Sequence, residues 1–132
     1  PTRRSSDLWL ISELKGNAEI TALIGDRIHS YVAPEQADYP FVVIHEITSP
    51  PLENQFADRI GDQENWMIKV YQKGSSDVVA DDIDRKIRTL LHKKTGANII
   101  SCVARQRLTQ AEQDANGNPI RAIIRYYEIL VS

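Results

Sequence analysis

Apolar residues near the start of the chain recur at the spacing of an amphipathic helix. Leu8, Ile11 and Leu14 form this stripe, and the side chains of residues 5–7 are typical helix caps. A second, shorter helical segment follows and ends at Gly25, where the lack of a Cβ favours a helix stop. The N-terminal quarter is therefore predicted to hold two helices.

Strand-like patterns occupy most of the remaining chain. Segments rich in β-branched or alternating apolar residues span 41–48, 63–73, 99–108 and 120–131. Asn116-Gly117 lies between the last two segments, and this dipeptide is a strong hairpin signal because both residues tolerate positive φ. We therefore predict that the last two strands pair antiparallel.

The clearest helix is predicted over residues 77–91. Its apolar stripe consists of Val79, Ile83, Ile87, Leu90 and Leu91. Its other side carries acid–base pairs one turn apart, which are Asp81–Arg85, Asp82–Lys86 and Asp84–Arg88. Each such pair contributes only about 0.2–0.5 kcal/mol, but together they predict that all three aspartates face solvent.

The elements predict one α+β domain. Their order is α-α-β-β-α-β-β, typical of a mainly antiparallel four-stranded sheet with one long helix and an N-terminal helix packed on it. No linker divides the chain, so we expect a single domain over 1–132. Residues 49–62 and 109–119 are rich in turn-forming and polar residues and are expected to be projecting loops.

Two predicted strands are apolar on both faces. Phe41 and Val43 alternate with Val42 and Ile44, and the last strand repeats the pattern. An antiparallel sheet with one face in solvent should alternate apolar and polar residues more cleanly. We therefore expect a cover on the second face, supplied either by the first helix or by another subunit.

The net charge and the number of cysteines limit the range of functions to be expected. The chain carries 16 basic and 18 acidic side chains, a net charge of −2, whereas duplex-DNA binders carry a basic excess that neutralises phosphates. A single cysteine cannot form an internal disulfide, and no apolar run approaches the roughly 20 residues that span a bilayer. We expect a protein of a bacterial-type cytoplasm whose main partner is neither membrane nor nucleic acid.

Chemistry-bearing residues do not form a constellation that predicts catalysis. His29, His45 and His92 lack partners at metal-ligand spacing. Cys102 lies in an apolar strand, which favours a buried and unreactive thiol. The six glycines are scattered near element boundaries, so no phosphate-binding loop is predicted. We expect a protein that is not an enzyme and that holds no cofactor or metal.

Arginines on the last two strands form a predicted basic patch. Arg105 and Arg107 share one face of their strand, and Arg121 and Arg125 share a face of the next. The patch is either solubilising charge at a sheet edge, a docking surface for an acidic protein rim, or a charge ladder between copies. The interface candidates in the projecting loops are Phe56, Asp58, Arg59 and Asn116.

The segment from residue 20 to residue 43 carries a series of motifs. Ile20-Thr21-Ala22-Leu23-Ile24-Gly25-Asp26-Arg27-Ile28 is followed by Val32-Ala33-Pro34 and then by Tyr39-Pro40-Phe41-Val42-Val43. This series resembles the opening of the tail-completion (minor tail) proteins of long-tailed bacteriophages and prophages, which are similar to tail terminators. The later strand–helix–strand order agrees, so the resemblance extends in outline over residues 8–131.

The motif positions are Gly25, Asp26, Arg27, Pro34 and Pro40, and each is interpreted as structural. Gly25 makes the helix stop, the two prolines stiffen the connection to the next strand, and Asp26 and Arg27 brace it by charge and hydrogen bonding. The resemblance supplies no catalytic residue and no cofactor.

The resemblance implies a structural virion protein. Tail terminators form a ring, typically a homo-hexamer, at the head-proximal end of the tail tube, where they end tube polymerisation and provide the head–tail joining surface. The implied partners are further copies of the chain, the major tail tube protein and the head–tail connector proteins, with DNA only passing through the ring lumen. The implied location is the virion tail, after assembly in the host cytoplasm.

Three alternatives stay open. A component of a head-side connector or stopper ring would co-purify with capsids instead of tails. A small cytosolic ligand-binding domain or enzyme would need a deep pocket with convergent polar groups. An adaptor that binds nucleic acid through the arginine patch would show steeply salt-dependent DNA affinity.

Overall fold

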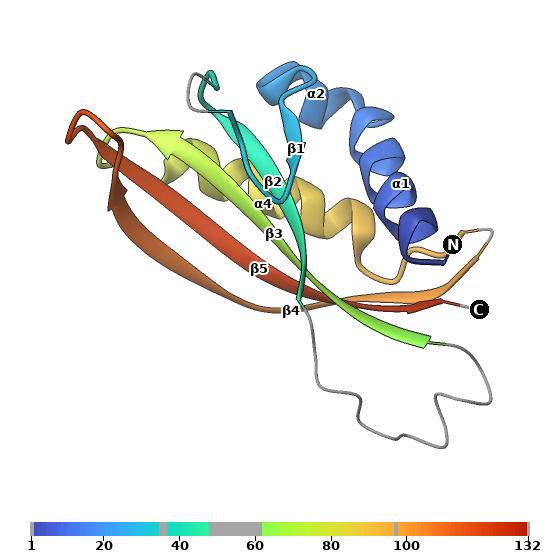
Figure 1. Ribbon diagram of the computed structural model, residues 1–132. Coiled ribbons are helices and arrows are strands. Elements are labelled where there is room, and N and C mark those ends of the chain that lie inside the picture. Colours follow the sequence, from blue (N-terminus) through green and yellow to red (C-terminus); the bar gives the residue numbers. More distant parts are fainter. Residues whose placement is uncertain (1, 35–36, 48–61, 97, 132) are drawn as a thin grey trace.

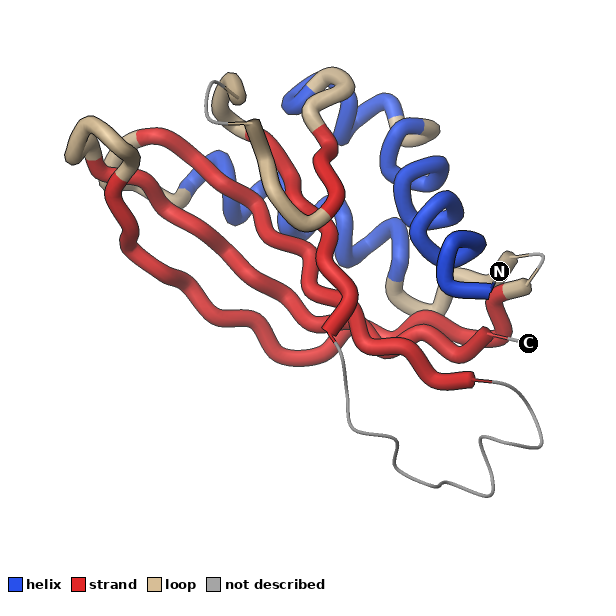
Figure 2. Tube along the Cα trace, in the orientation of Figure 1, coloured by secondary structure: helices blue, strands red, loops and turns tan. Residues whose placement is uncertain are grey.

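The computed structural model describes residues 2–34, 37–47, 62–96 and 98–131 (Figure 1). Within these residues the elements are α1 (Thr2–Lys15), α2 (Ala18–Ile24), β1 (Ile28–Ser30), β2 (Phe41–Ile47), β3 (Asp62–Lys73), α4 (Val78–Leu91), β4 (Ile99–Gln113) and β5 (Pro119–Val131). The helices lie together on one side of a twisted sheet (Figure 2). The described part of the chain is therefore a two-layer α+β structure, as predicted.

The sheet is mixed and not purely antiparallel. Its strand order is β1-β2-β3-β5-β4, and every neighbouring pair is antiparallel except β1 and β2, which are parallel. The predicted four-stranded sheet is therefore wrong, because β1 adds a fifth strand at the edge. β1 has three residues, too few to show an alternation in sequence. It forms because the chain leaving α2 runs along β2, where the Tyr31 N–H donates to Ile44 O (2.8 Å).

The N-terminal helix differs from its prediction in start and orientation. α1 begins at Thr2, so residues 5–7 lie inside the helix and do not precede it as caps. Leu10 and Leu14 are buried, whereas Leu8 is 65% exposed. At 14 residues α1 is as long as α4, so the prediction of one long helix is also corrected.

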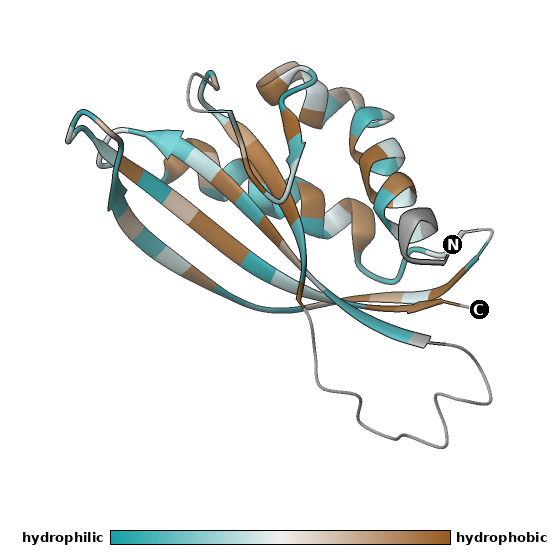
Figure 3. Ribbon diagram, in the orientation of Figure 1, coloured by the Kyte–Doolittle hydropathy of each residue, from teal (hydrophilic) through white to brown (hydrophobic). Residues whose placement is uncertain are grey.

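The core lies between the helices and one face of the sheet. Along each central strand every second side chain turns towards the helices. Figure 3 shows apolar positions, in brown, on the helices and along the central strands that they cover. The largest fully buried side chains are Trp66, Tyr127, Leu10, Leu14, Ile20, Ile24, Ile44, Ile68, Ile83, Ile87, Leu91 and Ile123. Burying one such side chain contributes about 1.5–3 kcal/mol, so this layer is the main source of stability.

The β4–β5 hairpin is longer than predicted. β4 continues to Gln113, so residues 109–113 of the expected loop are strand and a short turn joins β4 to β5. Asp114 Oδ1 accepts hydrogen bonds from the backbone N–H groups of Asn116 and Asn118 (2.9 Å each), and Gly117 has φ 81°. The Asn-Gly signal thus marks the turn correctly. The other expected loop, 49–62, lies outside the described residues except for its last residue, where β3 begins.

The connection from α2 to the sheet is fixed by one glycine and one arginine. Gly25 has φ 60° and ψ −126°, values of the first central position of a type II′ turn, which a Cβ would strain. The Arg27 N–H closes this turn by donating to Ile24 O (3.0 Å). The Arg27 guanidinium donates to Pro40 O (2.9 Å) and Leu23 O (3.2 Å). Arg27 therefore ties the end of α2 to the start of β2.

Candidate interaction surface

The sheet face opposite the helices is a candidate interaction surface. The strand register places side chains in rows across it, for example Leu108 beside Ile124, and Ile124 beside Lys69. We call this surface the open face, and its residues are Phe41, Val43, Met67, Lys69, Tyr71, Leu108, Ala122, Ile124 and Tyr126. α1 packs in the same core as α2 and α4, so the first helix does not supply the second cover that the sequence predicted.

The open face is apolar at its centre and exposed at both edges. Val43 and Ile124 are shielded by their neighbours and are only 4% and 5% exposed. At the β4 edge Leu108 is 38% exposed, and beside β1 Tyr31 and Val32 are 47% and 79% exposed. Lys69 lies between Val43 and Ile124 in the strand register, so the apolar side chains of this face are interrupted by one lysine. A face with this many apolar side chains is less polar than a solvated sheet face usually is.

A groove runs over the open face between the hairpin turn on one side and residues 31–34 and 37–39 on the other. Two adjoining cavities of about 330 and 520 Å³ share Tyr39, Asp114 and Ala115 in their walls. The smaller cavity lies over Phe41 and Tyr71, whose rings stack with centroids 5.0 Å apart. The groove is therefore wide enough for a side chain and has an aromatic floor.

The groove is lined by both acidic and basic side chains: Asp114 is in the walls of both cavities, Lys73 lines the larger one and Lys69 the smaller. Burial, followed by the charges of Asp114 and Glu112, raises the pKa of Tyr39. Burial and Glu112 likewise raise the pKa of Tyr71. Pro34, one of the motif residues, lines the smaller cavity.

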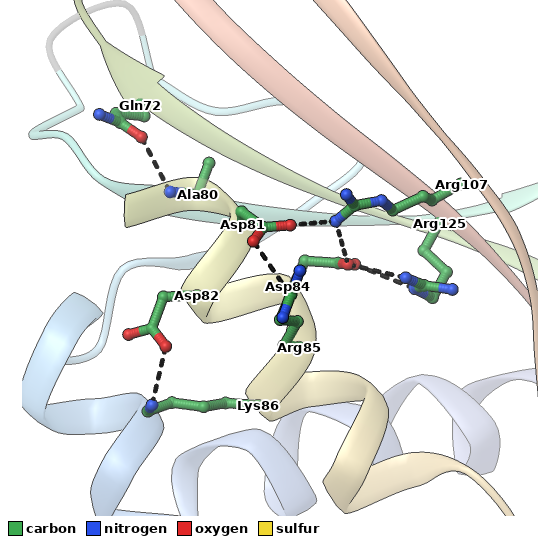
Figure 4. A network of polar contacts seen from close by, with 9 residues as sticks. All are labelled: Gln72, Ala80, Asp81, Asp82, Asp84, Arg85, Lys86, Arg107 and Arg125. Carbon is green, nitrogen blue, oxygen red and sulfur yellow. Dashed lines mark hydrogen bonds and ion pairs between the residues drawn. The ribbon is translucent and has the colours of Figure 1, made fainter. Parts of the chain in front are cut away.

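Two arginines of the predicted basic patch, Arg107 and Arg125, pair with carboxylates of α4 (Figure 4). Arg107 and Arg125 are cross-strand neighbours. Arg125 donates from Nε to Asp84 Oδ1 (3.1 Å) and from Nη2 to Asp84 Oδ2 (2.9 Å). Arg107 Nη1 adds a contact to Asp84 Oδ2 (3.3 Å). The Asp84 side chain is 3% exposed, so the expected solvent-facing position of Asp84 is wrong.

The burial pattern of α4 shows which spacing in the sequence indicates that Asp84 is buried. Ala80, Asp84, Ile87 and Leu91 are buried and are spaced four, three and four residues apart, which places them on one face of the helix. Val79, which the predicted stripe included, is 38% exposed. An acidic residue in the true stripe must be paired to be buried, and this spacing indicates a buried ion pair.

The two outer aspartates of α4 form the predicted ion pairs along the helix, and one of them, Asp81, also contacts the sheet. Asp82 pairs with Lys86 at 3.0 Å. Asp81 pairs with Arg85 at 3.0 Å and additionally accepts a hydrogen bond from Arg107. That hydrogen bond lowers the pKa of Asp81. Its stabilising contribution is therefore present above the ordinary pKa of an aspartate and is lost as the pH falls through the lowered value.

The remaining two arginines of the patch also have partners within the chain. Arg105 donates to Glu128 (2.7 Å), and Arg121 Nε donates to Ser75 O (3.1 Å). A β-bulge between Ala104 and Arg107 breaks the alternation, so Arg105 and Arg107 do not share a face as expected. These pairings favour a bracing role, and the docking role of the patch stays a prediction.

The interface candidates from the predicted loops are only partly placed. Asn116 lies in the hairpin turn, is exposed and lines the larger cavity of the groove. Phe56, Asp58 and Arg59 lie outside the described residues. Their contacts with partners stay predictions.

The chemistry-bearing residues are spread over the fold. His29 and His45 each pack against an aromatic ring, and His92 Nδ1 accepts a hydrogen bond from the Ala104 N–H (3.0 Å). The described residues contain no group of three or more His, Cys, Asp or Glu side chains that could hold a metal ion. In the same part of the chain, no helix is long and apolar enough to cross a membrane.

Cys102 should be inert in the folded protein. Its side chain is fully buried, and burial raises the pKa of its thiol to about 12, while only the thiolate reacts readily. We expect no labelling by a disulfide reagent at pH 8 in the native state and one equivalent of labelling after denaturation. Rapid stoichiometric labelling of the native protein would contradict the buried position.

One comparison with known proteins identifies a family, and another shows a shared fold. The model of the family described as "Tail completion protein gp17" matches residues 9–130. A chain of the solved structure titled "Virion of native gene transfer agent (GTA) particle" superposes with a TM-score of 0.65 at 12% sequence identity, over 93% of this chain and 92% of that one. At this identity the likeness concerns the fold. Among curated proteins none matches the sequence.

Proposed function

This chain belongs to the family described as Tail completion protein gp17, a structural protein of phage-type tails, and we propose that it forms a ring at the head-proximal end of the tail tube. In that position the ring ends polymerisation of the tube and provides the joining surface for the head. The role is structural and requires no catalytic step.

The open face is the observation that carries this proposal. A sheet whose second face is apolar is stable in an assembly, where another protein surface excludes water from it. The two edges of the sheet are also different, since β1 has three residues and β4 has 15. A copy with two unlike contact surfaces joins head to tail, and such contacts close into a ring when the rotation between copies fits.

The proposed partners follow from the position at the end of a tube. They are further copies of the chain, in a ring that we propose to be a hexamer, the major tail tube protein and the head–tail connector proteins. DNA passes through the lumen without being a specific ligand. The protein would be located in the tail of the finished virion, after assembly in the host cytoplasm. A chain of the gene transfer agent virion shares this fold, and its presence in a virion supports the proposed location in a virion.

Inactivating the gene in its phage or prophage tests the proposal. We expect tail tubes of uncontrolled length and free heads, and we expect the tagged protein, in complemented cells, to co-purify with free tails. Tubes of normal length, together with protein found only on free capsids, would contradict the proposal and assign the chain to the head-side connector. Complementation with the unaltered gene is the control and should restore tails of normal length.

A further inference from the structure

The outer edge of β4 lacks the usual protection of an edge strand. β4 pairs with β5 and lies at the end of the sheet, and its residues 105–113 are exposed. Natural sheets block such edges with proline, with projecting lysines or with inward-pointing charges, because an open edge pairs with other chains. The segment from Leu108 to Gln113, which we call the free edge, contains no proline or lysine and one charged residue, Glu112.

The arginines that could protect this edge are turned back onto the molecule. Arg107 reaches the carboxylates of α4, and Arg105 pairs with Glu128 of the neighbouring strand. The bulge beside them ends before the free edge begins. The backbone groups of the free edge are therefore left accessible to another strand.

Strand directions allow the two edges of the sheet to join. β1 and β2 run parallel, while β3 runs against β2, β5 against β3 and β4 against β5. β1 and β4 thus run in opposite directions. Copies that stand side by side around an axis parallel to the strands bring β4 of one next to β1 of another in antiparallel orientation, the more stable pairing geometry.

Exposed apolar side chains mark both edges on the same face. Leu108 ends one row of the open face at the β4 edge, and Tyr31 and Val32 lie at the β1 edge. Tyr31 packs against His45 of β2 with ring centroids 4.8 Å apart, which places it on the open face. Joining the edges would bury these side chains against each other in a continued apolar band.

We propose that the sheet continues from copy to copy: the free edge of β4 adds, by main-chain hydrogen bonds, to the β1 edge of a second copy of this chain. This inference rests on the proposed ring and names its subunit contact. The backbone pairing at β1 is short, because β1 has three residues and its Ile28 N–H and Ser30 O are already used within the chain. The open faces of neighbouring copies then form one continuous band around the ring, which the tube or the connector covers.

Disulfide trapping tests the contact on tail-bound protein. Ser30→Cys is combined in turn with Leu108→Cys, Thr109→Cys and Gln110→Cys, because the proposed contact of Leu108 with Tyr31 or Val32 places Ser30 opposite this segment and within reach of a disulfide. We expect one pairing to give a ladder of disulfide-linked multimers of the chain. The matched control is Ser30→Cys with Thr89→Cys, which places the second thiol on α4, and we expect it to give no ladder.

The outcomes separate this inference from the proposed function. Protein found on tails, but with no ladder from any of the three pairings, overturns the edge-to-edge contact and leaves the ring proposal standing. Disulfides to a different virion protein overturn the assignment of a second copy as the occupant. Absence of the protein from tails overturns the proposed function itself.

Hydrogen exchange gives a second measurement that needs no substitution. Amides of the free edge and the amide of Ser30 should exchange about tenfold or more slowly in tail-bound protein than in the free chain, because paired edge amides exchange only on opening. The amides of Ile28, Tyr31 and Val32 already donate within the chain and should change less. The exposed outer side of α4 should change little. Unchanged exchange at the free edge in tail-bound protein would contradict the pairing.

Discussion

Replacing Asp84 by alanine is expected to lower the free energy of unfolding by about 3–5 kcal/mol, the cost of breaking a buried ion pair from one side. The change removes the acceptor of two of the three Arg125 hydrogen bonds and of one Arg107 contact, and leaves the bond from Arg125 Nη1 to Arg105 O. The Arg125 side chain is only 12% exposed, so its charge cannot be rehydrated without moving the hairpin. Denaturant unfolding followed by circular dichroism measures the loss.

The matched control is Asp82→Ala on the same helix. The Asp82 side chain is 51% exposed and pairs with Lys86, so its removal should cost about 0.5 kcal/mol or less. The double variant Asp84→Leu with Arg125→Met should recover much of the stability, because an apolar pair of similar volume replaces the charges. Equal losses from Asp84→Ala and Asp82→Ala would show that the pair is not buried in solution.

The Asp84 cluster has a structural consequence for the assembly. It joins α4 to both strands of the β4–β5 hairpin, at the point where the bulge in β4 lies. The hairpin is thereby held at a fixed angle to the helix layer. A protein that presents the free edge of β4 to a neighbour requires that rigidity, because a mobile hairpin would lose entropy on pairing.

Replacing Trp66 by alanine is expected to cost about 3–5 kcal/mol as well, here through a cavity in the core. Trp66 is 1% exposed and is among the largest buried side chains. Its Nε1 also donates to Glu64 Oε1 (3.1 Å), so the substitution removes a donor from a buried carboxylate. Thermal and denaturant unfolding of the variant measure the effect.

Met67→Ala is the matched control for Trp66→Ala. Met67 is the next residue in β3 but lies on the open face, half-buried, so its truncation should cost about 1 kcal/mol. The difference between the two variants measures which face of the sheet is the core. A loss at Met67 as large as that at Trp66 would mean that the open face is covered within the single chain.

The sequence alone predicts the local elements of this protein well. The spacing of apolar residues in 77–91, the alternation in 63–73 and the Asn116-Gly117 turn each depend on neighbours within a few residues. The motif series in residues 20–43 identifies the tail-completion family in the same way, and the family match over residues 9–130 confirms it. Local geometry and turn chemistry act over short stretches, so a pattern in the chain is enough to reveal them.

Only the tertiary structure decides which groups far apart in the chain meet. Asp84 pairs with a residue 41 positions away. It is buried because of the way α4 lies on the sheet, which turns Asp84 inwards and leaves Val79 partly exposed. β1 forms because β2 offers it an edge, and α1 leaves the open face uncovered because it packs beside α4. These outcomes depend on packing and electrostatic interactions between elements that are far apart in the chain. A short segment of sequence therefore does not reveal them.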